Sequence, residues 1–224
     1  MVYLLSFLFA TGCVNDGPNF QIVYAAPGDN RVADVSTLLR ALVLTVNDAF
    51  GGSRTLRLDC SPIRSMQVPE RADFQKIDQT RQQTGYTNRL RKYIIFVDAP
   101  ANKTNCGEAS IAADTRHGPD NANNWGYGLA VLWSDCWLPG VVRHEVGHLL
   151  GAVQPSAPYG TSDFHCRTTG DVMCGTYFSA YDLSRDTYYN PNPAKGSYLD
   201  THWNIANSRF LDVTVPKVYT LFIP

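Results

Sequence analysis

The sequence predicts an α+β fold: helices packed on a twisted, mostly parallel sheet, followed by a smaller, irregular C-terminal lobe. Strand and helix patterns alternate along the first half of the chain, which is typical of parallel strands joined by helices. Residues 93–97 form a continuous apolar run, as expected of a strand that is buried on both faces. Beyond residue 151 the periodic patterns end, and Pro, Gly, Asn and Tyr become frequent. The fold class therefore rests mainly on the first 151 residues.

The first predicted strand and helix lie between residues 20 and 50. Residues 20–26 are rich in β-forming side chains and precede the turn pair Pro27-Gly28. Residues 34–50 show a helical period of apolar side chains, at Val35, Leu38, Leu39, Leu42, Val43, Val46 and Phe50. Gly51-Gly52 is expected to end this helix.

Four further elements are predicted before residue 100. Residues 55–58 and 63–68 are expected as short strands, and residues 72–83 as a polar, weakly amphipathic helix. Residues 92–98 contain the apolar run and are expected as the central strand. Strands and helices thus alternate along this part of the chain, which predicts a mostly parallel sheet.

The segment 101–125 is predicted to be a loop because it is rich in Asn, Asp and Gly. Asp114, Asp120 and Asn121 within it could hold a calcium ion, but they lack the spacing of a known calcium loop, which favours a solvated loop instead. Residues 127–133 are expected as the strand that leads into the next helix.

That next helix carries the most informative pattern, His144-Glu145-Val146-Gly147-His148. Residues four apart share one face of a helix, so two imidazoles could reach one zinc ion with the carboxylate of Glu145 nearby. These residue types serve metal-assisted hydrolysis, in which a carboxylate takes the proton of an attacking water. The alternative is a buried amphipathic helix with two incidental histidines. A set of apolar residues lies opposite the histidines: Val142, Val146, Leu149 and Leu150.

Composition and cysteine content narrow the class of protein. A chain of 224 residues fits one domain, or two lobes around one cleft. A net charge of −1 favours neither nucleic acid nor an anionic membrane surface as a partner. The six cysteines contain no pair spaced for a structural zinc site, and their even number suggests disulfides in an oxidising compartment, with buried free thiols as the alternative.

The N-terminal segment, residues 1–19, has two interpretations. Its apolar run could be a truncated signal peptide, although no Lys or Arg precedes it, or it could be a first strand. Cys13 follows small residues in a way that faintly resembles a bacterial lipoprotein cleavage site. No segment is long and apolar enough to suggest a membrane-spanning helix.

Taken together, these residues resemble the metzincin clan of zinc endopeptidases. The matching pieces are residues 144–151, which follow the His-Glu-x-x-His-x-x-Gly pattern, and residues 171–173, which look like the clan's Met-turn and contain Met173. Further stretches are similar to a group of secreted actinobacterial metallopeptidases: residues 151–154 with 156–158, 165–166 with 171–174, and 196–199 with 201–204. The resemblance implies an N-terminal catalytic lobe at residues 20–151, containing the active-site zinc helix, and a C-terminal lobe at residues 152–224.

The chain departs from the clan at the third metal ligand. The clan places a His or Asp three residues after the glycine, where this sequence has Gln154. An amide oxygen is a weak zinc ligand beside imidazole, so His165 is the favoured third ligand. Gln154 and an aspartate, such as Asp163 or Asp171, stay open as alternatives.

The resulting hypothesis is a secreted, monomeric zinc endopeptidase with a protein or peptide substrate. His144, His148 and His165 would hold zinc, and Glu145 would act as general base. The strand at residues 127–133 is expected to border the substrate cleft. Two rivals are a binding protein with an impaired metal site, suggested by Gln154, and a zinc hydrolase of cell-wall peptides.

The six cysteines are predicted to form three disulfides. Such bonds would anchor the N-terminus, tie the Asn-rich loop to the entrance of the zinc helix, and brace His165 against the Met-turn. In that order, the predicted pairs are Cys13–Cys60, Cys106–Cys136 and Cys166–Cys174.

Overall fold

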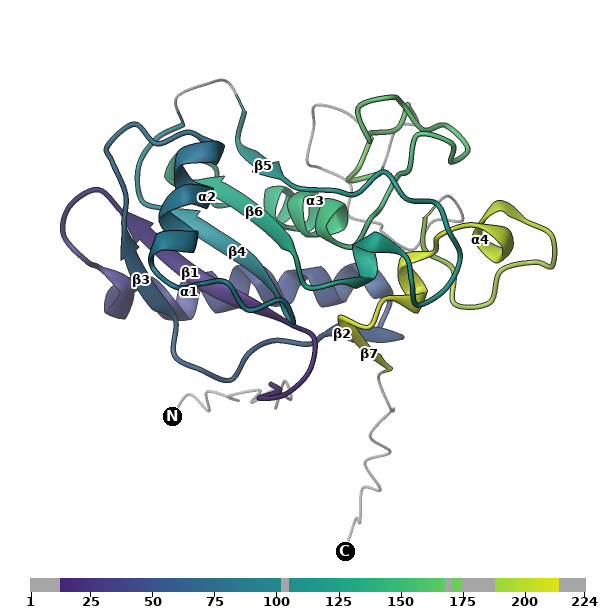
Figure 1. The fold of residues 1–224 in the computed structure, drawn as a ribbon, viewed down its shortest axis with the longest axis horizontal. Helices are drawn as coiled ribbons and strands as arrows, with labels where there is room; N and C mark the ends of the chain where they lie inside the picture. The colour runs from purple at the N-terminus through teal and green to yellow at the C-terminus, as the bar shows by residue number, and fades with distance from the viewer. Residues whose placement is uncertain (1–12, 102–104, 168–170, 175–187, 214–224) are drawn as a thin grey trace, which may run out of the picture.

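The computed structural model of the chain describes residues 13–101, 105–167, 171–174 and 188–213. Its centre is a five-stranded sheet with the strand order β3-β1-β4-β6-β5 (Figure 1). The pairs β1–β3, β1–β4 and β4–β6 are parallel, whereas β5 runs antiparallel to β6. A mostly parallel central sheet was predicted and is confirmed. In sheet order, the strands are Arg64–Gln67, Asn19–Ala26, Arg91–Val97, Gly128–Trp133 and Gly107–Ala109.

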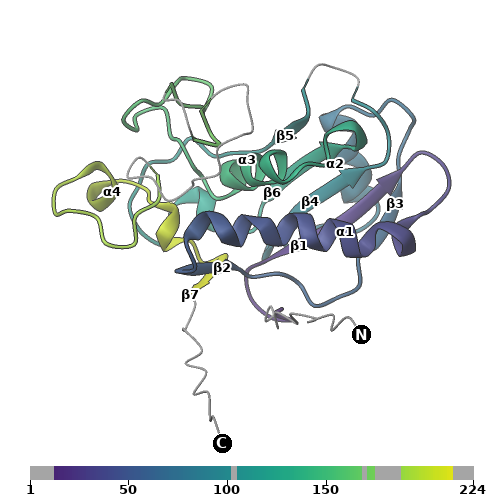
Figure 2. The same ribbon diagram turned by 180° about the vertical axis from the view of Figure 1, so that it is seen from behind.

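Helices cover both faces of this sheet. The helices α1 (Val32–Leu44) and α3 (Pro139–Leu149) share one hydrophobic core with the sheet, and α2 (Phe74–Gln83) belongs to a second core. Figure 2 shows α1 crossing in front of the strands, on the side that faces away in Figure 1. The strands supply side chains to both cores because alternate residues point to opposite faces.

The central strand β4 illustrates this alternation. Ile94 and Phe96 lie in the core with α1 and α3, whereas Tyr93, Ile95 and Val97 lie in the core with α2. All five side chains are buried. The continuous apolar run in the sequence is therefore explained by burial on both faces of the sheet.

The predicted helix at residues 34–50 is divided into two elements. Helix α1 is followed directly by the 3₁₀ helix η1 (Thr45–Phe50), and Gly51 ends it with a φ of 53°. The next strand, β2 (Arg54–Leu56), pairs antiparallel with β7 (Leu211–Val213). Through this pair, the C-terminal part of the chain returns to the N-terminal half.

The segment 101–125 differs from the loop that was expected. It contains strand β5 at the edge of the sheet and the short 3₁₀ helix η2 (Ala122–Asn124). Strand β5 has three residues, too few for a periodic pattern, and it forms through pairing with β6. Because β6 lies between β4 and β5, residues 127–133 offer no free edge to which an extended substrate could add as a strand.

Other elements connect these parts or follow them. The 3₁₀ helix η3 (Ser134–Cys136) precedes α3, and two short helices lie in the C-terminal region, α4 (Tyr198–Thr201) and η4 (Ile205–Asn207). Helix α4 lies at one end of the molecule in Figure 1. No helix in the described part of the chain has the length and apolar character needed to cross a bilayer.

All six cysteines form disulfide bonds in the structure. The pairs are Cys13–Cys60, Cys106–Cys136 and Cys166–Cys174. The first bond joins the segment before β1 to the segment after β2. The apolar run expected as a signal peptide or first strand falls within residues 1–12, outside the described residues.

The charged side chain of Lys92 lies inside the core. Lys92, in β4, is only 2% exposed, and its ammonium nitrogen lies 4.8 Å from the ring centroid of Phe210. Burial lowers the pKa of Lys92 to about 7. The ring offers a favourable cation–π contact, but it does not replace the water that the ammonium group loses.

Replacing Lys92 with Met should stabilise the protein at neutral and acidic pH. A lowered pKa means that the unfolded chain binds more protons than the folded one between about pH 7 and the ordinary lysine value of about 10.4. The free-energy penalty of burying the ammonium group in the wild type is therefore largest below pH 7. It disappears as the pH rises toward about 10.4. Urea unfolding of both proteins at several pH values measures this difference. A gain in stability that does not change with pH would contradict a buried ammonium group as its cause.

Candidate metal centre

The helix α3 is the frame of the candidate site. Pro139 begins it, where a missing backbone N–H costs nothing, and every residue from Gly140 to Leu149 is buried. The helix ends at Leu149, and Gly151, two residues later, has a φ of 85°. A Cβ atom at Gly151 would lie 2.6 Å from both Asn123 Cγ and Trp203 Nε1, so glycine is required for space as well as for backbone conformation.

Three histidine rings meet beside this helix. His144 and His148 lie one turn apart, and their Nε2 atoms are 3.1 Å from each other. The Nε2 atom of His165, from the loop that follows the helix, lies 3.2 Å from that of His144. Each ring offers a nitrogen within 4.8 Å of the other two, so the three residues could hold a metal ion.

The protonation of His144 follows from its partner on the other ring nitrogen. Nδ1 of His144 lies 2.7 Å from the carbonyl oxygen of Val172, which can only accept a hydrogen bond. Nδ1 must therefore carry the hydrogen, and Nε2 of the neutral ring presents a lone pair toward His148 and His165. A carbonyl behind a metal-binding histidine commonly fixes the tautomer in this way.

The donor set fits zinc. Zinc accepts imidazole nitrogens at about 2.0–2.1 Å in tetrahedral geometry, which places neighbouring nitrogens about 3.3–3.4 Å apart. The Nε2 atom of His144 lies 3.1 Å from that of His148 and 3.2 Å from that of His165, close to that value. Two of the rings are also neutral at physiological pH. Burial lowers the pKa of His144 to about 4, and burial with the neighbouring histidines lowers that of His148 well below its usual range.

The loop that carries His165 is held by backbone contacts and by a disulfide. The Thr161 hydroxyl donates to the carbonyl oxygen of His165 at 2.8 Å and accepts from its N–H at 3.1 Å. The next residue, Cys166, is bonded to Cys174, and its N–H donates to the carbonyl oxygen of Met173. His165 is thereby fixed at its backbone, although its side chain is 38% exposed.

The segment 171–174 is a tight turn beneath the helix. The Asp171 side chain accepts from the N–H of Met173 at 2.8 Å, and the Asp171 carbonyl accepts from the N–H of Cys174 at 3.0 Å. Met173 is completely buried in the core that contains α3. The turn thus brings both the Val172 carbonyl and Met173 to the helix, an arrangement that had no signal in the sequence beyond the short resemblance at residues 171–173.

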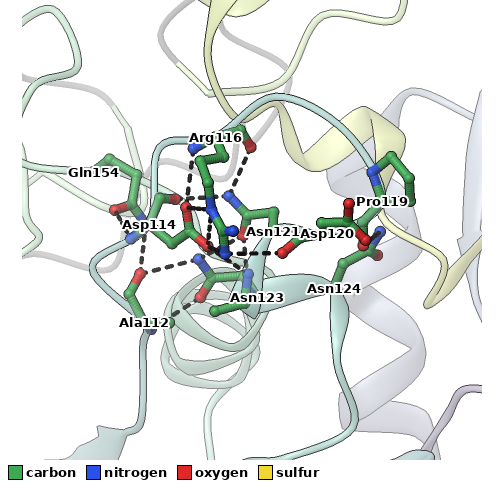
Figure 3. Close-up of polar contacts among 10 residues, drawn as sticks. Ala112, Asp114, Arg116, Pro119, Asp120, Asn121, Asn123, Asn124 and Gln154 are labelled. Carbon is green, nitrogen blue, oxygen red and sulfur yellow. Dashed lines mark hydrogen bonds and ion pairs between the residues drawn. The ribbon is translucent and has the colours of Figure 1, made fainter.

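Gln154 has a different role from the histidines. Its side-chain oxygen accepts from the N–H of Asp114 at 3.1 Å, and its amide nitrogen donates to the carbonyl oxygen of Ala112 (Figure 3). The same nitrogen also donates to the carbonyl oxygen of Gly151. Both ends of the amide are engaged in fastening the 112–114 segment to the end of α3. The sequence left Gln154 open as a metal ligand and gave no sign of this contact.

The candidate calcium ligands also serve the loop in Figure 3. The Asp114 carboxylate forms an ion pair with Arg116 at 2.6 Å and accepts from the N–H of Ala122 at 2.7 Å, and these contacts hold its pKa well below its usual range. The Asn121 amide nitrogen donates to the carbonyl oxygens of Asp114 and Arg116. The side chains of Asp114 and Asn121 are therefore used in hydrogen bonds that fold the loop.

Glu145 is buried between α3 and the edge strand. It is 4% exposed, and burial raises its pKa to about 8, with the nearby charge of Glu108 acting in the same direction. A cation at the three imidazole nitrogens would oppose this effect and favour the carboxylate. The strand beside Glu145 is β5, which the sequence did not indicate.

The proteins of known structure that match this chain are only distantly similar to it. No protein-family model matches the chain, and no curated protein matches it either. Three solved structures share 16% sequence identity with it. They are a chain in the structure of a chaperone-substrate complex (TM-score 0.45), metalloproteinase-II from Bacteroides fragilis (0.42) and archaemetzincin from Methanopyrus kandleri (0.40).

The matched regions differ in extent. They cover 87%, 79% and 73% of this chain, and 34%, 52% and 83% of those chains, in the same order. The protein thus spans about a third and about half of the first two. A functional assignment for this chain accordingly depends on the chemistry of its own site.

Zinc affinity should depend on His165 far more than on Gln154. Removing an imidazole that donates to zinc should cost more than the 10–100-fold typical of residues that only support a ligand. The loss of zinc affinity in Gln154→Ala should stay within about that range, because the amide contacts the 112–114 segment and does not bind the metal. Zinc titration against a competing chelator measures both. Release of the metal by Gln154→Ala, with retention by His165→Ala, would make the assignment wrong.

The same titration should show weaker zinc binding at low pH. Protons and zinc compete for the imidazole nitrogens, so affinity falls as each ring becomes protonated. The lowered pKa values of His144 and His148 confine competition at these two rings to acidic pH. A loss of affinity on raising the pH from 5 to 7 would contradict imidazole ligation.

Proposed function

We propose that this protein is a secreted zinc-dependent endopeptidase. The observation that supports the proposal is the convergence of three imidazole nitrogens, two of them from the helix that also carries the buried Glu145. Three protein ligands leave a fourth zinc position for water or substrate, as in catalytic rather than structural zinc sites. The three disulfides are typical of proteins in oxidising compartments, which supports secretion.

Both proposed lobes contribute residues to the proposed active site. Residues 20–151 supply His144, Glu145 and His148, and residues 152–224 supply His165 and the turn with Met173. When bound, zinc would polarise the scissile carbonyl and make a water molecule more acidic. Glu145 takes the proton of that water as it attacks, holds it on its carboxylate, and passes it to the nitrogen of the leaving amine.

The edge of the sheet suggests how a peptide substrate would bind. Strand β5 is the last strand of the sheet and lies next to α3, and an extended peptide can pair with the outer edge of such a strand. Main-chain pairing favours peptides of varied sequence. Peptide cleavage is therefore the reaction to test. The substrates in the assay should include cell-wall peptides as one class.

The geometry also bears on the rival proposal of an impaired binding protein. That rival was motivated by Gln154 at the clan's third-ligand position. Here both ends of the Gln154 amide are hydrogen-bonded to the 112–114 segment. His165 instead places an imidazole nitrogen, a stronger zinc ligand than an amide oxygen, next to that of His144. The arrangement supports a complete three-histidine site and so favours the enzyme.

Glu145→Gln should retain zinc and lose hydrolysis. The carboxylate moves protons but donates no ligand atom, and a general base contributes roughly 10²–10⁴-fold to the rate. Glu70→Gln is a matched control because Glu70 is exposed. Cleavage of casein and of a peptide library, with zinc content measured in parallel, tests the proposal. Near wild-type cleavage by Glu145→Gln, or no cleavage by the zinc-loaded wild type, would refute it.

A further inference from the structure

Gly107, in the edge strand β5, occupies a position where glycine is not needed for backbone conformation. Its φ lies outside the left-handed region, unlike that of Gly51 or Gly151. Its neighbours in β5 are Glu108 and Ala109, which shows that the strand accepts ordinary side chains. The reason for glycine at this position must therefore be space.

That space is occupied by Glu145. A Cβ atom at Gly107 would lie 2.5 Å from Glu145 Oε1, 2.7 Å from Cγ and 2.8 Å from Cδ. These are its three nearest atoms, and all of them belong to one side chain. Carbon atoms that are not bonded to each other approach to about 3.5 Å, so a methyl group and the present carboxylate position are incompatible.

Neither side of this contact can move freely. Strand β5 is in register with β6, with Gly107 opposite Leu132, and the adjacent Cys106 is bonded to Cys136 in η3, just before α3. The Trp133 N–H also donates to the carbonyl oxygen of Cys106. Glu145 itself belongs to a helix whose residues are buried on all sides.

We propose that Gly107 is a positioning residue for Glu145. The missing side chain lets the carboxylate lie against the backbone of β5, and the Cys106–Cys136 bond keeps the strand there. This inference rests on the proposed function, in which Glu145 moves the proton. It adds that β5, the strand with which a peptide would pair, is in direct contact with the Glu145 carboxylate. A bound peptide would therefore be cleaved where it passes Gly107.

The contact itself can be tested without any enzymatic assay. The full chain is prepared as wild type, Gly107→Ala, Glu145→Ala and the double variant, and thermal unfolding is measured with zinc and with chelator. Gly107→Ala should lower the Tm by about 5 °C, as overpacking of a core does. In the Glu145→Ala background most of that loss should disappear, because the carboxylate is absent. Equal losses in both backgrounds would overturn the inference.

A kinetic measurement then tests the functional consequence. Gly107→Ala should lower kcat by roughly tenfold or more, the scale expected when a proton-transferring group is displaced. KM and zinc content should change little. Gly28→Ala is the matched control, because a Cβ at Gly28 meets nothing within 4 Å, and it should leave kcat unchanged.

The possible outcomes separate the two proposals. Unchanged kcat in Gly107→Ala, or a rise in KM alone, would overturn the positioning role while the peptidase assignment stands. An inactive wild type would refute the proposed function, and the unfolding cycle would still decide whether Gly107 makes room for Glu145. If Gly107→Ala does not fold, the comparison of the double variant with Glu145→Ala decides the contact, since both lack the carboxylate. A double variant that also fails to fold would overturn the inference.

Discussion

The hydrogen bond from Nδ1 of His144 to the carbonyl oxygen of Val172 connects the two parts of the site. On the helix side, it assigns the hydrogen to Nδ1 and directs the lone pair of Nε2 toward the other two histidines. On the other side, it holds the 171–174 turn beneath the helix. Since Cys174 is bonded to Cys166, the position of this turn also limits where His165 can lie.

The loop that bears His165 has little regular structure of its own. Between the end of α3 and residue 167, the structure shows no helix or strand, only turns and an isolated bridge between Gly160 and Cys166. Backbone contacts from Thr161 and the disulfide supply the order that a sheet or helix would otherwise provide. A disulfide limits the unfolded chain and so lowers the entropic cost of ordering such a segment.

Just after the end of α3, an amide side chain has a comparable role. Gln154 is buried and uses both its oxygen and its nitrogen on the backbone at residues 112, 114 and 151. An imidazole has one donor and one acceptor in a fixed ring and could not form all three bonds. The presence of glutamine at this position is thus explained by the loop between β5 and β6, whose Asp114 is in turn neutralised by Arg116.

Much of this protein could be predicted from local sequence, and the rest depended on contacts between distant segments. Helical geometry alone places His144 and His148 on one face, because residues four apart are always neighbours in a helix. The apolar run in β4 likewise predicts its own burial. In contrast, strand β5, the meeting of His165 with His144 and the contact of Gly107 with Glu145 join residues 21 to 38 positions apart. Such contacts leave no periodic trace in the sequence, and only the packed tertiary structure decided them.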